Sequence, residues 1–322
     1  MVRNPIAFGF TTLLLFFAFS CTRQDDGAPS PGLSILQSVK NNPCGYRYTS
    51  LPSQAVEIAA GGSGNAYILS TELEPNGGHK IYYWGWNVEP ANGQWTYIPS
   101  PGAIAIDGSF NNEPVIVTAQ GEIYYSSYNS SSETWTWTQF TTGSPPAATA
   151  IASGPFNRLS QPSGLDGLFI LGTSYIPGGH PVYRYERSTN TWIQQGTQGA
   201  MKITVDAYRS PWIIDDTGKV FKLYWNNTVT NWIPVPVPGG SAKDIQSNAW
   251  TSVTITGCPV SSSQYDPCPS GNTFWQDAGP DPTLQGWTSI YGVYGKRASK
   301  AGYTIWFIGD DNKLWRNPVT YN

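Results

Sequence analysis

A short pattern of residues repeats along most of the chain and constrains its fold more than any other feature. Each copy opens on an alanine that is followed three residues later by an isoleucine, then continues with an apolar run, a turn and an aliphatic–aromatic pair. Most copies close on a tryptophan. The clear copies begin at Ala55, Ala103, Ala148, Ala200 and Ala242, and a degraded copy falls at Val293 and Lys296. A period of roughly 40 to 50 residues with four short strands in each unit is typical of a β-propeller.

The segments within each repeat have the character of strands. Residues 67–69 and 115–117 are short runs of β-branched, aliphatic or aromatic residues, and Gly, Pro, Asn or Asp lies close to their ends. Only 12% of the residues are charged, where about 25% is usual in globular proteins. Helical spacing is absent after the N-terminal segment, so the sequence predicts an all-β fold.

The order of the pattern predicts how the propeller closes. The last repeat reaches its third strand at Leu314 and Trp315, and residues 46–52 carry the pattern of the missing fourth strand, with Tyr48 in the place of the closing tryptophan. We therefore expect residues 46–52 to pair antiparallel with residues 313–316, which hides strand edges that would otherwise be open. The predicted fold is a six-bladed β-propeller of four-stranded antiparallel blades, closed by an N-terminal strand that completes the last blade.

The N-terminal residues predict export. Arg3 precedes an apolar stretch over residues 6–19 that is too short to span a bilayer comfortably. Ala18-Phe19-Ser20-Cys21 resembles the end of a bacterial lipoprotein signal peptide, with Cys21 as the acylated residue; an ordinary secretion signal cleaved nearby is the alternative. We predict a signal peptide over residues 1–21, a flexible tether over 22–43 and the propeller over 44–322. The protein would then be anchored by lipid to a bacterial membrane, on the periplasmic or the surface face.

The remaining cysteines and the charge balance narrow the chemistry. Cys258 and Cys268 bracket a loop rich in Ser and Pro, and an oxidising compartment would let them form a disulfide. Cys44 is then left over, although it could pair with Cys21 if Cys21 stays a thiol. No Cys or His set has the spacing of a metal site, and we expect neither metal nor cofactor. The net charge of −3 and the lack of a basic stripe argue against nucleic-acid binding.

The repeat unit as a whole resembles that of the tectonin β-propeller family. Residues 192–203 and 232–245 each carry a tryptophan, a short spacer and the Ala-x-x-Ile pattern, and residues 211–221 add an apolar strand, a Gly turn and an aliphatic–aromatic pair. The resemblance extends from about residue 44 to 317. The marks of WD40, kelch and sialidase repeats are absent or fit less well.

This resemblance implies carbohydrate recognition, because the family includes lectins for bacterial surface glycans and lipopolysaccharide. It also includes intracellular scaffolds. We therefore predict a membrane-anchored, non-catalytic propeller that binds envelope or surface glycans, with a protein-binding scaffold of the cell envelope as the alternative. Exposed aromatic rings with polar neighbours on one face would favour a sugar, and a broad apolar patch would favour a protein partner.

The loops point to one face as the ligand face. The connections between the second and third strands are long in the first, third and fifth repeats and short in the others. Gly-Gly pairs precede His79 and His180 at the ends of two long connections, and Asn272 has the same place in the fifth repeat. Imidazole and amide groups both donate and accept hydrogen bonds, which suits sugar hydroxyls. Alternatively, these residues only begin a strand after a Gly turn.

Tryptophans outside the repeat pattern are the stacking candidates. The aromatics at fixed repeat positions are expected to pack between sheets, and the candidates that break the pattern are Trp84, Trp86, Trp225 and Trp275. Asp215-Asp216 and Asp310-Asp311 are paired carboxylates, as acid/base hydrolysis would need. Both fall at short hairpin turns, where Asp is expected for backbone reasons. Because no Ser-His-Asp arrangement appears in the right context, we expect that the protein is not an enzyme.

Overall fold

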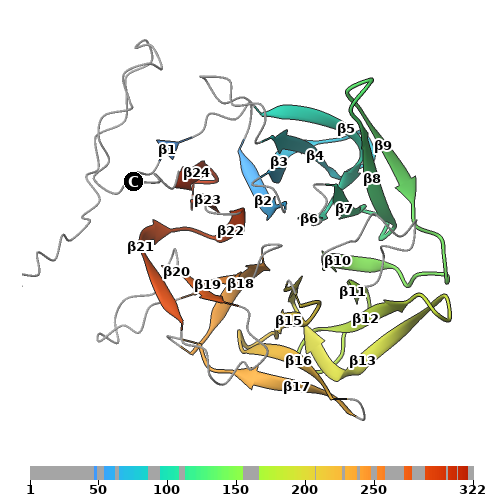
Figure 1. Cartoon of the computed structure of the whole chain (residues 1–322), viewed down its shortest axis with the longest axis vertical. Helices are drawn as coiled ribbons and strands as arrows, with labels where there is room; N and C mark the ends of the chain where they lie inside the picture. Colours follow the sequence, from blue (N-terminus) through green and yellow to red (C-terminus); the bar gives the residue numbers. More distant parts are fainter. Residues whose placement is uncertain are drawn as a thin grey trace, which may run out of the picture.

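The computed structural model consists of four-stranded antiparallel sheets arranged in a ring (Figure 1). The described residues are 47–48, 54–61, 65–85, 95–108, 113–154, 167–206, 208–226, 229–237, 240–247, 252–257, 272–277, 287–301, 304–309 and 311–317. Among these residues, no helix has the length and apolar character needed to cross a membrane.

Five sheets are each built from four strands that follow one another in sequence, and we call them blades 1 to 5. Blade 1 contains β2 (Ala55–Ala60), β3 (Ala66–Leu73), β4 (His79–Trp84) and β5 (Thr96–Ala103). Blade 2 contains β6 (Ala105–Gly108), β7 (Pro114–Val117), β8 (Ile123–Asn129) and β9 (Thr134–Gln139). Blade 3 contains β10 (Ala148–Ser153), β11 (Leu168–Gly172), β12 (His180–Glu186) and β13 (Thr191–Ala200).

Blade 4 contains β14 (Lys202–Val205), β15 (Pro211–Ile214), β16 (Val220–Asn226) and β17 (Val229–Val235). Blade 5 contains β18 (Ala242–Ser247), β19 (Ser252–Gly257), β20 (Asn272–Asp277) and β21 (Thr288–Tyr294). These blades confirm the prediction of an all-β propeller made of four-stranded antiparallel sheets.

One further sheet combines strands from the two ends of the chain, and we call it the mixed sheet for that reason, although all its strands pair antiparallel. It contains β1 (Arg47–Tyr48), β22 (Arg297–Ala301), β23 (Thr304–Ile308) and β24 (Leu314–Asn317), in the order β1-β24-β23-β22. Arg47 lies opposite Arg316 and Tyr48 opposite Trp315. The pairing that involves β1 is therefore only two residues long.

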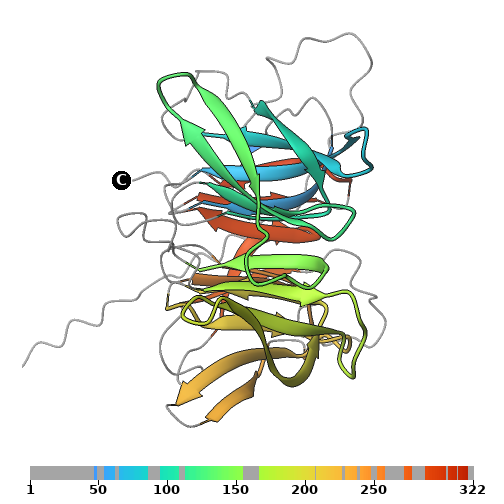
Figure 2. The ribbon, with the colours of Figure 1, turned by 90° about the vertical axis from the view of Figure 1, so that its right-hand side faces the viewer.

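The innermost strand of each sheet lies toward the centre of the ring (Figure 1). It is the first strand of blades 1 to 5 and β22 in the sheet that contains both chain ends, and we call these strands the first strands. Neighbouring first strands contact one another from β2 through β6, β10, β14 and β18 to β22. Seen from the side, the sheets stack face to face (Figure 2). The degraded repeat is displaced from its predicted place at Val293 and Lys296. Val293 belongs to the fourth strand of blade 5, and Ala298, which pairs with Phe307, occupies the position of the isoleucine.

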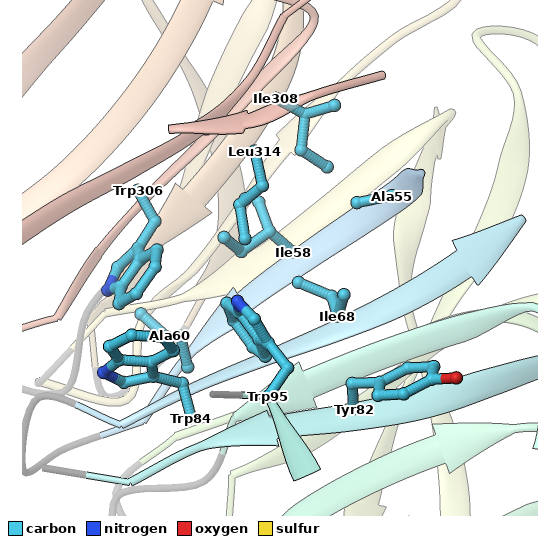
Figure 3. Close-up of a cluster of buried hydrophobic side chains, with 11 residues drawn as sticks. Ala55, Ile58, Ala60, Ile68, Tyr82, Trp84, Trp95, Trp306, Ile308 and Leu314 are labelled. Atoms are coloured by element: carbon cyan, nitrogen blue, oxygen red, sulfur yellow. The ribbon is translucent and has the colours of Figure 1, made fainter. Parts of the chain in front are cut away.

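The repeated isoleucines hold each first strand against the second strand and the neighbouring blade. Ile58 pairs with Ile68, and both are buried beside Trp306, Ile308 and Leu314 of the mixed sheet (Figure 3). Burial of one such aliphatic side chain stabilises the fold by about 1.5–3 kcal/mol. Repetition of this contact around the ring explains why the pattern recurs.

Hydrogen bonds between neighbouring blades also recur. The indole N–H groups of Trp137, Trp232 and Trp287 donate to the backbone of the preceding blade at Pro99, Gln195 and Pro236, over 2.7–2.9 Å. Near the ring centre, backbone N–H groups of Ala60, Ser153 and Ser247 donate to side chains of the preceding sheet. Their acceptors are Ser299, Asp107 and Thr204. These bonds give the repeating aromatics a structural role, as the sequence predicted.

Candidate ligand site in the central channel

One residue of every first strand occupies the same register position, and we call this set the channel ring. Each member directly precedes the repeated isoleucine position. It pairs with the residue of the second strand that directly follows the partner of that isoleucine position. The channel ring consists of Glu57, Ala105, Ala150, Lys202, Asp244 and Arg297.

All members of the channel ring line a cavity of about 170 Å³ at the centre of the propeller. Ile104, Met201 and His180 also line it, and the exposure of Ile104 and Met201 places its mouth at the start of the first strands. This end of the strands carries the connections between second and third strands. The cavity therefore opens on the predicted ligand face.

The channel ring is charged on one side and small on the other. Glu57, Arg297, Asp244 and Lys202 follow one another around the ring with alternating sign, whereas Ala105 and Ala150 complete it. Arg297 Nη1 lies 3.1 Å from Glu57 Oε2, and Lys202 Nζ lies 3.8 Å from Asp244 Oδ1. A ligand in this cavity meets hydrogen-bond donors and acceptors in turn along one side and apolar atoms on the other.

Asp244 is the most unusual member of the channel ring. Asp244 is only 3% exposed, and neither oxygen of its carboxylate has a hydrogen-bond partner of good geometry within the described part of the chain. Burial raises the pKa of Asp244, although the positive charges of Arg297 and Lys202 oppose this shift. A buried polar atom without a partner destabilises a fold by about 1–3 kcal/mol, so these oxygens point to a hydrogen-bond donor that enters the cavity.

An exposed tyrosine contacts His180, which lines the cavity. Tyr175, in the long connection between β11 and β12, is 61% exposed, and its hydroxyl donates to Asp216 Oδ2 over 2.7 Å. Its ring meets the imidazole of His180 edge to face, with centroids 5.7 Å apart. His180 Nδ1 donates to the carbonyl of Ser174 over 2.9 Å, which leaves Nε2 of the neutral imidazole as an acceptor for a ligand or solvent.

The two histidines differ in position, although each is the first residue of its strand. His180 lines the cavity, whereas His79 is absent from its lining. The preceding glycines have a steric role: a Cβ on Gly78 would lie 2.4 Å from the backbone of Gly102, and one on Gly179 would lie 2.6 Å from that of Ala200. Close backbone approach thus explains the second glycine of each pair, whereas the first glycines, Gly77 and Gly178, have positive φ. Asn272 begins β20, but its side chain lies outside the described residues.

Trp84 is a core residue and not a stacking platform, which corrects its prediction as a ligand residue. It is 4% exposed and packs against Trp95 and Trp306 (Figure 3). The Arg316 guanidinium lies 4.7 Å from the centre of the Trp84 ring. This packing leaves no ring face open to a sugar.

The remaining residues that the sequence singled out lie mostly outside the part of the chain that the structure describes. Trp86, Cys21, Cys44, Cys258 and Cys268 lie outside the described residues, as do the side chains of Trp225 and Trp275.

Within the described ranges, no group of three or more His, Cys, Asp or Glu side chains could hold a metal ion. Asp215 accepts hydrogen bonds from the backbone of Thr217 and Lys219, so it stabilises a turn as predicted.

The channel ring was missed because the sequence pattern was recognised by its constant residues. In the five clear copies, the ring residue is the second variable residue of the Ala-x-x-Ile pattern. Its type differs from copy to copy, being Glu, Ala, Ala, Lys and Asp in order along the chain. Charged residues at a position next to a buried isoleucine in a propeller's innermost strand could have indicated it. Tyr175 was missed because it lies in a connection and repeats nowhere.

Comparison with known proteins supports the fold. No protein-family model and no curated protein matches the chain. A gluconolactonase from Xanthomonas campestris shares the fold with a TM-score of 0.50 and 9% identity, over 83% of this chain and 88% of that one. Virginiamycin B lyase from Staphylococcus aureus aligns with a TM-score of 0.47 and 12% identity, over 85% and 100% of the chains. A lectin from Aleuria aurantia, in complex with Fucα1-6GlcNAc, aligns with a TM-score of 0.47 and 11% identity, over 84% and 93%.

These similarities correct one prediction. The prediction that the protein is not an enzyme is wrong, because a gluconolactonase has the same kind of fold and the fold is therefore compatible with catalysis. The missing catalytic motif in the sequence does not decide the question, since propeller sites are assembled from separate blades. At such low identity the likeness concerns the fold alone. By its sheets and its structural neighbours, the chain is a β-propeller.

Proposed function

We infer that the protein binds carbohydrate at the mouth of its central channel. The observation that carries this proposal is the exposed ring of Tyr175, which Asp216 holds and which packs against His180, a residue that lines the cavity. An aromatic ring with polar neighbours on the long-connection face was the feature expected of a sugar site. The ligand would be an envelope or surface glycan, lipopolysaccharide included.

The contacts of Tyr175 suit a sugar in two ways. The hydrogen bond from its hydroxyl to Asp216 Oδ2 holds the ring in one orientation, which reduces the entropy lost when a ligand packs on it. The ring supplies an apolar surface for the C–H groups of a pyranose, and aromatic contacts of this kind contribute about 0.5–1.5 kcal/mol beyond area burial. His180 and Asp216 supply polar groups for hydroxyls at the ring edge.

The test compares two exposed tyrosines. Tyr175→Ala should weaken binding to an array of bacterial envelope glycans about tenfold, or about 1.4 kcal/mol. The matched control is Tyr208→Ala, since Tyr208 is 56% exposed but lies in the turn between β14 and β15, at the opposite end of the strands. The proposal is overturned if no glycan is bound, or if both variants lose the same affinity. Retention of an envelope protein without any glycan would support the scaffold alternative.

A second candidate is an enzyme that acts on the bound carbohydrate. Asp244 favours it, because a buried carboxyl with a raised pKa beside Lys202 and Arg297 is a common arrangement for general acid or base catalysis. Turnover would be sought by following candidate saccharides by NMR. Asp244→Asn should abolish it, and unchanged saccharides would exclude this candidate for the compounds tested.

We also propose the two finer features expected from the sequence. A ring of six blades, closed by β1, is supported by the pairing of Arg47 with Arg316 and of Tyr48 with Trp315. Export and lipid anchoring through Cys21 rest on the sequence of residues 1–21. Cys21→Ala should release the protein from bacterial membranes and abolish labelling with a fatty-acid analogue; unchanged membrane partitioning would refute the anchor.

A further inference from the structure

We propose that the channel ring recognises the carboxylate and a hydroxyl of a sugar acid, such as the terminal uronic acid of a glycan. The structural basis is the buried carboxylate of Asp244, whose oxygens lack a hydrogen-bond partner of good geometry among the described residues, beside the ammonium of Lys202 in a cavity of about 170 Å³. This inference rests on the proposed carbohydrate binding and names its ligand class.

The hydroxyl partner follows from Asp244. Both of its oxygens can accept hydrogen bonds, and among the described residues neither has a partner of good hydrogen-bond geometry, although the backbone N–H of Ile245 is near enough to favour the charged form. A sugar hydroxyl donates one hydrogen bond and accepts others, so it satisfies Asp244 and can take a bond from Lys202 or Arg297 at the same time. The alternating order of acceptor and donor around the charged side fits a row of neighbouring hydroxyl or carboxyl groups.

The carboxylate partner follows from Lys202. Its Nζ lies 3.8 Å from Asp244 Oδ1, beyond hydrogen-bond distance, and its side chain is 33% exposed. Arg297, by contrast, lies 3.1 Å from Glu57. Lys202 therefore has donors available for an anion, and hydrogen bonds between an ammonium and a carboxylate are about twice as strong as neutral ones.

The size and the apolar side of the cavity limit the ligand. At about 30 Å³ for each water, the cavity holds the equivalent of only a few water molecules, so one sugar residue enters and a longer glycan extends outward. Ala105 and Ala150 leave room for that residue, and Ile104 and Ile151 present apolar atoms to the C–H face of the sugar. The next sugar along the glycan would then reach Tyr175 at the mouth.

The decisive experiment compares sugars that share a ring and differ in charge. Calorimetric titration of the full chain with D-glucuronate, D-glucose and D-glucosamine should give at least tenfold tighter binding of glucuronate than of glucose, and the weakest binding for glucosamine. Lys202→Met should remove the preference for glucuronate, and Lys202→Arg should restore part of it. Asp244→Asn should weaken glucuronate and glucose together.

A control variant distinguishes the ammonium inside the cavity from a cation on the nearby surface. Lys243→Met removes the same charge from the exposed residue beside Asp244, which lies outside the cavity lining, and should leave the preference intact. Thermal unfolding checks that every variant folds. The inference is wrong if glucuronate and glucose bind alike, if the preference survives Lys202→Met, or if Lys243→Met removes it equally.

The outcomes also separate this inference from the proposed function. If no sugar binds, both fail. If glucose and glucuronate bind equally and both weaken in Tyr175→Ala, carbohydrate binding at the mouth stands and the preference for acids is refuted. If the preference is present and depends on Lys202, both are supported.

Discussion

Two buried aspartates of this propeller differ in what surrounds them. Asp206 accepts the indole N–H of Trp212 over 2.9 Å, pairs with Lys222 Nζ at 3.2 Å and accepts backbone N–H groups of its own turn. Its charge is therefore fully compensated within blade 4. Asp244 faces a cavity and accepts no hydrogen bond from any side chain of the described ranges. Hydrogen-bond satisfaction thus separates a structural carboxylate from one that is available to a ligand.

Removal of the cation of the compensated pair should destabilise the fold strongly. Lys222 is buried, with its ammonium 4.9 Å from the centre of the Trp212 ring, and Lys222→Met leaves the charge of Asp206 uncompensated. The expected loss is about 3–5 kcal/mol in the free energy of unfolding, measured in urea. Lys219→Met is the control, because Lys219 is exposed in the same hairpin and such changes stay within about 0.5 kcal/mol. Similar stability of the two variants would contradict this role of the pair.

The seam between blades 2 and 3 should make stability depend on pH. Burial raises the pKa of Asp107 from 3.8 to about 7, against the effect of its hydrogen bonds from Ser153. The carboxyl of Asp107 therefore keeps its proton in the folded state up to about pH 7, whereas in the unfolded state it releases the proton near pH 3.8. The stability that this proton contributes is complete below pH 3.8, falls as the pH rises to about 7 and is absent above it. Asp107→Asn should remove it. Urea unfolding of both proteins from pH 4 to 8 tests this, and a constant difference between them would contradict it.

At the scale of strands, the sequence predicted what repeats and missed what varies. The second and third strands with their buried aliphatics were foreseen, because an apolar run that ends on an aliphatic residue such as Leu69 or Val117 follows each Ala-x-x-Ile copy. The degraded repeat was misplaced because Gly295 and Ala298 stand where Ala and Ile are diagnostic, so its register was visible only from the pairing of β22 with β23. Trp84 broke the sequence pattern, yet only the packing of blade 1 against the mixed sheet shows that it fills a core.

Glycine at position 179 is required by the contact between β12 and β13. Its φ is +130°, and a Cβ would lie 2.6 Å from the backbone of Ala200. Gly179→Ala should therefore lower the free energy of unfolding by about 1–3 kcal/mol and displace His180. Gly77→Ala separates the two causes, because Gly77 also has a positive φ, +91°, but nothing lies within 4 Å of its Cβ position. Thermal unfolding should show a clearly smaller effect for Gly77→Ala; equal effects would mean that backbone strain alone is responsible.

At the scale of the whole molecule, the ring arrangement creates the candidate site. The first strands converge at the centre of the ring (Figure 1). Only this convergence brings Glu57, Lys202, Asp244 and Arg297, which belong to different sheets, to one cavity. No local motif encodes such a site, which is why the sequence pointed to loop residues instead. Of the loop residues named from the sequence, His180 lines the cavity, and its role in ligand binding stays a prediction; Tyr175, which contacts it, was not recognised.

Closure of the ring through β1 can be tested by deletion. Residues 44–52 include β1, whose two residues pair with Trp315 and Arg316 of β24, and their removal should leave the edge of β24 unpaired. An open edge loses backbone hydrogen bonds and promotes association between chains, so we expect a lower midpoint, a broader thermal transition and aggregation at high protein concentration. Deletion of residues 22–43 serves as the control, since the predicted tether should contribute nothing to the stability of the ring. An unchanged transition after deletion of 44–52 would show that the propeller is complete without β1.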